Sequence, residues 1–191
     1  MNFKEIAFES VWVAKLDVFP DARGYFYEFY SESEKFVNSP IRFKPQQSNM
    51  SLSKKGALRG IHFSLAPGGQ IKWLTCVSGS ILDCVVDLRE GSPTFGRHHL
   101  IRVSAAEPQA LLIDSGIGHA FLSLEENTIV NYLLSSPYDP TFEVGVNPLD
   151  ETLGIDWPTD DLILSDKDRS AMTLTDAGLL RKLPQYISKA I

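Results

Sequence analysis

The chain has 191 residues, and its 18 Lys and Arg against 24 Asp and Glu give a formal net charge of −6. This length predicts one domain, residues 1–191, which is large enough to fold without disulfides or a structural metal. The acidic balance argues against nucleic-acid binding, which needs cations to neutralise phosphates, although a few local cations would suffice for a small anionic ligand.

The first ten residues contain Lys4, Glu5 and Glu9 and have no continuous apolar core, so they do not predict a signal peptide. No stretch approaches about 18 uncharged apolar residues, so the sequence predicts no membrane span. Cys76 and Cys84 lie in apolar runs and lack the spacing of a zinc site or a disulfide framework. These features together predict a cytoplasmic protein with buried, reduced thiols.

Short apolar runs separated by Gly, Pro, Ser, Asn and Asp predict many strands rather than many helices. The expected strands, in chain order, are 11–19, 25–30, 57–65, 71–77, 81–88, 99–103, 110–113, 119–124 and 128–135. Turn residues at 20–24 and at 78–80 each predict a hairpin, and after Pro140 only 175–182 predicts a helix, with Thr173 or Thr175 as its N-cap. Strands at roughly ten-residue spacing predict an antiparallel sandwich or barrel.

Strand alternation places some polar side chains on faces that a plain core would not contain. Lys72 shares a strand face with Leu74 and Cys76, and an inward lysine is unfavourable unless it is paired or functional. His62 lies close to an arginine and a glycine, and His119 follows a glycine turn. Each of these residues, taken singly, is more often structural than catalytic.

A metal site is the main chemical alternative for a small barrel of this type. Such a site needs closely spaced histidines followed by a carboxylate. His62 is instead followed by Phe63 and Ser64, and the next Glu in the chain is Glu90. The sequence therefore favours a site without metal.

Several short motifs occur in a fixed order along most of the chain. They are DARGYFYE (21–28), QSN (47–49), LRGIHF (58–63), QIK (70–72), VDLREGSPTFG (86–96), GHAF (118–121), YDP (138–140), LGIDWP (153–158) and LSDKD (164–168). With this ordered set, the chain from about residue 10 to residue 170 resembles the dTDP-4-dehydrorhamnose 3,5-epimerase family of deoxysugar biosynthesis.

The resemblance implies an all-β fold, a cupin-type jelly roll with extra N-terminal strands and a short C-terminal helical segment. It also implies a homodimer that exchanges its N-terminal strands, a dTDP-4-keto-6-deoxy sugar as substrate, and no cofactor or metal. Carried over by position, His62 would be the base, Asp168 would pair with it, Lys72 would stabilise the enolate oxygen, and Tyr132 would return a proton from the opposite face. Other positions match family residues that contact the substrate. In the same chain these are Gln47, Asn49, Arg59, His119 and Tyr138. Arg23, Phe26 and Glu28 match residues that would reach the partner's site.

These residue types suit the chemistry that the resemblance implies. Inverting a carbon next to a ketone needs a base, a group that stabilises the enolate and an acid on the opposite face. A neutral imidazole with an ordinary pKa near about 6.5 is a workable base at neutral pH, and a tyrosine still carries its proton there. An ammonium aimed at the enolate oxygen favours the transition state, and arginine forks such as Arg23 and Arg59 match the oxygens of a diphosphate.

The sequence leaves several alternatives open. Ser64 stands where the family usually has Gln, and Leu133 and Leu134 follow Tyr132 where a Lys is common. In these positions the chain is more similar to family members of antibiotic-type deoxysugar pathways. Some of those enzymes invert C3 alone, so the sequence leaves open whether C3, C5 or both are inverted. A nucleotide-sugar 3,4-ketoisomerase and an inactive sugar-nucleotide-binding barrel are further alternatives, although an inactive barrel would be expected to have lost its catalytic residues.

Overall fold

The structure, a computed structural model, describes residues 1–32, 36 and 38–188. Over these residues the regular secondary structure is mainly strands, with short helices near the C-terminal end. The strands are β1 (Asn2–Ala7), β2 (Val11–Lys15), β3 (Val18–Asp21), β4 (Gly24–Tyr27), β5 (Gln47–Ser53), β6 (Leu58–Ser64), β7 (Lys72–Ser78), β8 (Ser80–Asp87), β9 (His98–Ser104), β10 (Gln109–Ile113), β11 (Ile117–Ser123), β12 (Thr128–Leu134) and β13 (Glu143–Gly145). The helices are α2 (Asp166–Arg169) and α3 (Leu174–Leu179).

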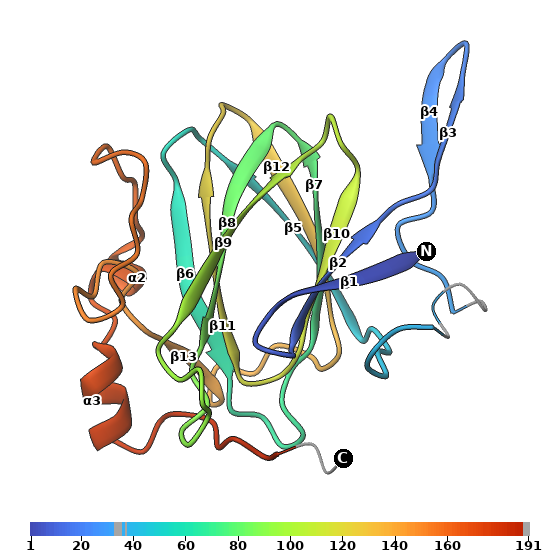
Figure 1. Ribbon diagram of the computed structural model, residues 1–191. Coiled ribbons are helices and arrows are strands. Elements are labelled where there is room, and N and C mark those ends of the chain that lie inside the picture. The colour runs from blue at the N-terminus through green and yellow to red at the C-terminus, as the bar shows by residue number, and fades with distance from the viewer. Residues whose placement is uncertain (33–35, 37, 189–191) are drawn as a thin grey trace.

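Two antiparallel sheets face each other across an apolar core (Figure 1). Among the described residues, the strand order is β1-β2-β10-β7-β12-β5 in the first sheet and β13-β6-β11-β8-β9 in the second. The core between them includes Leu74, Val85, Leu111, Phe121 and Val130, which all point inward from their strands. The predicted all-β, cupin-type class is confirmed.

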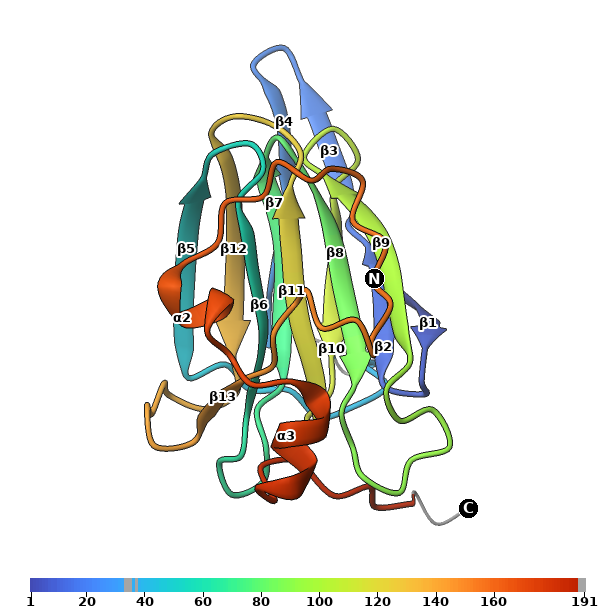
Figure 2. The same ribbon diagram turned by 90° about the vertical axis from the view of Figure 1, so that its left-hand side faces the viewer.

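The outer face of each sheet is also covered. Trp73 and Leu112 point away from the central core and pack with Phe36 and Phe43 from the N-terminal part of the chain. On the other side, the C-terminal segment lies over the outer face of the five-stranded sheet (Figure 2). This third layer carries α2 and α3, and it brings residues near 165 beside β6.

The predicted helix exists but is shorter than expected. It is α3, and the Thr173 side chain caps it by accepting a hydrogen bond from the Asp176 backbone N–H. Helix α2 was not predicted, because four residues are too few to show a helical periodicity.

Strands β1, β5 and β13 were also not predicted. In β5 the sequence QSNMSLS has only Met50 and Leu52 as apolar residues, and both face solvent.

The predicted hairpin at 78–80 is wrong. Strand β7 belongs to the first sheet and β8 to the second, so Gly79 carries the chain from one sheet to the other. Gly79 has a φ of 73°, and a Cβ at this position would lie 2.6 Å from Thr128 Oγ1, so the turn requires glycine. The residues of a turn indicate a reversal of direction, but they do not determine which sheet the next strand joins.

The turn at 20–24 does form a hairpin, between β3 and β4, which projects away from the two sheets (Figure 1). The predicted strand 11–19 is divided into β2 and β3 to allow this. The hairpin exposes aromatic side chains, with Phe19 at 52% and Phe26 at 66% relative exposure. No helix in the described part of the chain is both long enough and apolar enough to cross a membrane.

Candidate active site

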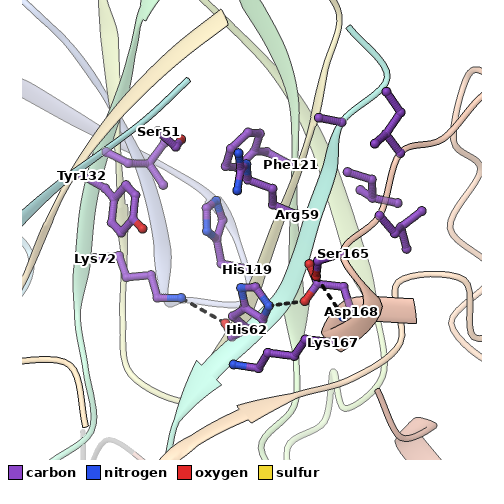
Figure 3. A pocket seen from close by; sticks show the side chains of 15 residues that line it. Ser51, Arg59, His62, Lys72, His119, Phe121, Tyr132, Ser165, Lys167 and Asp168 are labelled. Carbon is purple, nitrogen blue, oxygen red and sulfur yellow. Dashed lines mark hydrogen bonds and ion pairs between the residues drawn. The ribbon is translucent and has the colours of Figure 1, made fainter. Parts of the chain in front are cut away.

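A cavity of about 470 Å³ lies between the sheets, beside α2 (Figure 3). Strands β6 and β11 contribute to it from one sheet and β5, β7 and β12 from the other. Its lining residues are Ser51, Ala57, Leu58, Arg59, His62, Lys72, Leu74, His119, Phe121, Tyr132, Ile163, Leu164, Ser165, Lys167 and Asp168. The cavity thus contains the four predicted catalytic residues, together with two of the predicted binding residues.

A bulge in β6 allows Arg59 and His62 to face the same cavity. Residues three apart on a regular strand point to opposite faces, but the register between β6 and β11 shifts here, with Phe121 opposite Arg59 and His119 opposite His62. Gly60 lies in the bulge with a φ of 119°, and a Cβ there would lie 2.5 Å from the His119 carbonyl oxygen. The bulge in the RGIH sequence therefore places the side chains of Arg59 and His62 in the same cavity.

His62 is held by the carboxylate of Asp168. The His62 Nε2 to Asp168 Oδ1 distance is 2.6 Å, and the Ser165 side chain caps α2 by accepting a hydrogen bond from the Asp168 backbone N–H. Burial would raise the pKa of Asp168, but the hydrogen bond and charge of His62, together with Ser165 and Gly60, lower it below its ordinary value. An ionised carboxylate accepts the Nε2 proton, so a neutral His62 has its lone pair on Nδ1.

Lys72 is buried in the opposite wall of the cavity (Figure 3). Its ammonium donates a hydrogen bond of 3.0 Å to the backbone carbonyl of His62. Desolvation lowers the pKa of Lys72 to about 8, although the negative charges of Glu143 and Asp83 oppose this shift. The side chain is thus mainly cationic at neutral pH, as the predicted role in stabilising an enolate requires.

Tyr132 projects from β12, which lies beside β7, so it enters the cavity from the sheet that faces His62 (Figure 3). Burial raises the pKa of Tyr132, and a side-chain hydrogen bond with Asn49 and the charge of Arg59 offset part of that rise. The phenol is therefore protonated at neutral pH. A base on one sheet and a proton donor on the other is the arrangement that inversion of a carbon requires.

A second histidine–carboxylate pair borders the cavity. His119 Nε2 lies 2.7 Å from Asp83 Oδ2, and Asp83 is fully buried on β8. The other oxygen, Asp83 Oδ1, has no hydrogen-bond partner among the described residues. Sequence reasoning missed Asp83, although a carboxylate inside the apolar run ILDCVV is an available signal of a functional or paired residue.

Two cations lie at the exposed side of the cavity. Arg59 donates to Ser53 Oγ at 3.1 Å and to the Leu52 carbonyl at 3.2 Å, which ties its guanidinium to β5. Lys167 was not predicted, although it lies beside Asp168 in the LSDKD motif and lines the cavity. Ser51 was also missed, although its position on the same strand face as Asn49 could have indicated it.

The remaining predicted residues lie outside the cavity of their own chain. Arg23 and Phe26 belong to the β3–β4 hairpin, and Glu28 follows it. Gln47 and Asn49 lie on β5, and Tyr138 is exposed in the loop after β12. The Tyr138 backbone N–H donates to Gln47 Oε1, and Gln47 Nε2 donates to Asn49 Oδ1. In the part of the chain that the structure describes, no group of three or more His, Cys, Asp or Glu side chains is placed to hold a metal ion.

The fold and the cavity together define an all-β protein whose two sheets enclose a histidine–carboxylate pair, a buried lysine and a tyrosine. A family model described as dTDP-4-dehydrorhamnose 3,5-epimerase matches residues 5–176. The chain belongs to this family, whose members are epimerases and hence isomerases, and the predicted family and enzyme class are thereby confirmed.

The chain is similar both to relatives named as 3-epimerases and to relatives named as 3,5-epimerases. A dTDP-4-dehydrorhamnose 3-epimerase of Streptomyces niveus is 39% identical over 97% of this chain and 90% of its own length. A dTDP-4-dehydrorhamnose 3,5-epimerase of Mycolicibacterium smegmatis is 38% identical over 97% of this chain and 92% of its own length. The solved structure of ChmJ, a 3'-monoepimerase from Streptomyces bikiniensis in complex with dTDP-quinovose, is 42% identical, with a TM-score of 0.90 over 95% of this chain and 92% of that chain.

Proposed function

We propose that the protein epimerises a dTDP-linked 4-keto-6-deoxyhexose at C3, at C5 or at both carbons. The observation that carries this proposal is the placement of His62 and Tyr132 on opposing sheets, with the Lys72 ammonium inside the same cavity. A related 3'-monoepimerase was solved with dTDP-quinovose, which supports a dTDP-sugar as the ligand.

In the proposed reaction, His62 removes the proton from a carbon next to the C4 ketone. The electron pair of the broken C–H bond forms the enolate double bond, and negative charge moves to the C4 oxygen. Lys72 stabilises this charge, and a well-placed donor of this kind typically contributes about 10²–10³ in rate. Tyr132 then gives its proton to the same carbon from the opposite face, which leaves imidazolium at His62 and phenolate at Tyr132, and proton exchange with water restores both.

The charges around the cavity support an anionic substrate despite the net charge of −6. Arg59 and Lys167 are both exposed at the cavity and supply the cations that a diphosphate needs. We assign the diphosphate to this side and the sugar to the interior beside Lys72. The thymidine nucleotide, the single domain over 1–191 and the cytoplasmic location all stay predictions.

We further propose a homodimer in which the β3–β4 hairpin reaches the partner's cavity. The hairpin projects from its own chain with Phe19, Tyr25 and Phe26 exposed, and it carries Arg23 at its tip. Apolar surface of this kind is typical of an interface. The proposal would place Arg23, Phe26 and Glu28 against the substrate bound to the second copy.

Deuterium exchange tests the epimerase proposal directly. The protein is incubated with dTDP-4-keto-6-deoxyglucose in D2O, and the C3 and C5 proton signals are followed by NMR. Exchange at both carbons supports two inversions, and exchange at one supports a single inversion. Absence of exchange at both carbons contradicts the proposal, and movement of the ketone from C4 to C3 would indicate a ketoisomerase.

Tyr132→Phe separates the two halves of the reaction. The variant keeps the base but lacks the acid, so inversion is expected to fall at least about 10²-fold while exchange persists. Tyr186→Phe is a matched control, because Tyr186 packs against Arg89 away from the cavity. Equal loss of inversion and exchange in Tyr132→Phe would contradict the division between His62 and Tyr132.

Mixed dimers test the exchanged hairpin. His62→Ala and Arg23→Ala are each expected to be inactive or strongly impaired as homodimers. After random mixing, about a quarter of all sites would combine an intact His62 with an intact Arg23 from the other copy, so activity should return. A mixture no more active than its components, or a monomer by light scattering, would contradict the shared site.

A further inference from the structure

The β3–β4 hairpin, which projects from the two sheets in Figure 1, has two faces with different contacts. Tyr25 and Tyr27 lie on one face, where their rings stack and the Tyr25 hydroxyl donates to the Ala105 carbonyl at 3.3 Å. Tyr27 also packs against the apolar cluster around Trp73. The tyrosine face is therefore held by contacts within its own chain.

The opposite face of the hairpin, the phenylalanine face, carries Phe19, Asp21 and Phe26. In the register of the hairpin Phe19 lies opposite Phe26, and Asp21 lies opposite Gly24. Residues two apart on a strand share a face, so the Asp21 carboxylate lies on the same side as the two phenylalanine rings. Both rings are more than half exposed, so this face is the one that the hairpin can present to a second copy.

Asp21 binds Arg23 through both the backbone and the side chain. Asp21 Oδ1 accepts the Arg23 backbone N–H at 2.8 Å, which shapes the two-residue turn between β3 and β4. The carboxylate also accepts from the guanidinium, with Arg23 Nε 3.1 Å from Asp21 Oδ2 and Arg23 Nη2 bound to the same oxygen. These side-chain and backbone hydrogen bonds lower the pKa of Asp21 below its ordinary value, so the carboxylate is ionised at neutral pH.

This pairing determines where the guanidinium of Arg23 lies. Arg23 belongs to the turn, where strand alternation does not set the direction of a side chain, and its side chain is 90% exposed. The bonds to Asp21 hold it at the phenylalanine face. The carboxylate engages the edge of the guanidinium that carries Nε and Nη2, so the edge formed by Nη1 and Nη2 faces away from Asp21. A phosphate can bind such an edge through two parallel hydrogen bonds.

We propose that Asp21 is a positioning residue, which holds the Arg23 guanidinium at the phenylalanine face so that it meets the diphosphate bound in the partner's cavity. This inference rests on the proposed exchange of the hairpin. An exposed ion pair adds little to stability, but an arginine that is already oriented loses less conformational entropy when it binds. An aspartate that only neutralised Arg23 would have the opposite effect, because its removal would strengthen the binding of an anion.

Asp21→Asn tests the inference by binding of dTDP, measured by calorimetry. The amide oxygen still accepts the Arg23 backbone N–H, so the turn is kept, whereas the charged pair with the guanidinium is lost. The affinity for dTDP is expected to fall about three- to tenfold, and further in Arg23→Ala. Asp17→Asn is the matched control, because it removes the same charge from an exposed side chain at the base of the hairpin. Unchanged or tighter binding by Asp21→Asn overturns the inference.

A double-mutant cycle shows whether Asp21 acts through Arg23. In the Arg23→Ala background, Asp21→Asn should have no further effect on dTDP binding, because no guanidinium is left to orient. In steady-state turnover, Asp21→Asn alone should raise KM and leave kcat within about twofold, because it does not touch the proposed base and acid. An equal effect of Asp21→Asn in both backgrounds, or a lower kcat with unchanged KM, contradicts a role through Arg23.

NMR of the protein without ligand reports the orientation of Arg23 directly. Nitrogen-15 relaxation of the Arg23 Nε–H should show restricted motion in wild type and faster motion in Asp21→Asn, with the Phe26 backbone N–H unchanged. Equal mobility of the Arg23 Nε–H in the two proteins overturns the inference.

Failure of the shared site gives a different result from failure of this inference. If Arg23→Ala binds dTDP as tightly as wild type, the proposed hairpin exchange is wrong, and the inference is overturned with it. If Arg23→Ala weakens dTDP binding but Asp21→Asn does not, only the inference is overturned, and the shared site is supported. Both variants weakened, with Asp17→Asn unchanged, is the result that we expect.

Discussion

The two histidine–carboxylate pairs at the cavity differ in how they are built. His62 pairs with Asp168, which lies 106 residues away on a short capped helix, and 35% of the His62 side chain is exposed. His119 pairs with Asp83 on the adjacent strand, and only 12% of its side chain is exposed. Asp168 has hydrogen bonds to both of its oxygens, whereas Asp83 has a buried oxygen without a partner in the described chain.

This difference fits two roles. A base must reach substrate and exchange its proton with water, which an accessible ring held by a fully hydrogen-bonded carboxylate can do. A ring fixed between strands beside a fully buried carboxylate is better suited to binding and to stabilising charge, because its position cannot adjust easily. We therefore expect the two residue pairs to take different roles because their accessibility differs.

Replacing the two histidines gives the largest expected difference between the pairs. His62→Ala should abolish exchange and inversion at both carbons, by at least about 10³-fold, because the neighbouring imidazole of His119 is held against the buried Asp83. His119→Ala should retain exchange and act mainly on KM. NMR exchange rates with steady-state kinetics check both, and substantial exchange in His62→Ala would reverse the assignment.

Replacing the carboxylate of the first pair comes next. Asp168→Asn removes the charge that fixes the His62 tautomer, so kcat should fall about 10²-fold with the fold intact. The folded-state pKa of Asp168 is lowered, so its contribution to stability is present above its unfolded value of 3.8 and is lost as the pH falls through the folded pKa. The free energy of unfolding, measured with denaturant, should therefore be larger for wild type than for Asp168→Asn at pH 7. The difference between the two proteins should disappear in acid.

Asp83→Asn tests the second pair and should have a smaller effect on rate. The amide can still hydrogen-bond His119 but loses the negative charge, so kcat/KM should fall about tenfold through misplacement of the ring. Exchange should persist, as measured by NMR in D2O. A loss as large as that of Asp168→Asn would remove the distinction between the pairs.

The smallest expected effect concerns Lys72, which donates to the His62 carbonyl and is influenced by the charge of Asp83. Its pKa is lowered from 10.5 to about 8, so the unfolded state binds more protons between these values, and stability relative to Lys72→Met should rise with pH in that window. The rate should decrease over the same range because the ammonium is lost. Denaturant unfolding at about pH 7.5 and about pH 9.5 checks the stability, and a falling difference would contradict the lowered pKa.

The inward position of Lys72 was predictable from the sequence, because alternation places it with Leu74 and Cys76, and all three are buried. The ordered motifs also predicted that His62, Asp168 and Tyr132 would meet, as they do. Asp83 was not predicted, since its partner lies on another strand and depends on register. Lys167 was missed because an exposed residue has no periodic signal, and Ser51 was missed because β5 was not predicted as a strand.

By itself the sequence determined the all-β class, the faces of the main strands and the family. These follow from the twofold period of a strand and from short motifs, which are local properties of the chain. Tertiary structure alone decided that β7 and β8 join different sheets, that a bulge at Gly60 lets Arg59 and His62 face the same cavity, and that Gln47 links the Tyr138 backbone to Asn49, which lies opposite Tyr132. Such features depend on which strands pair and in which register, and those choices are made by packing between residues far apart in the chain.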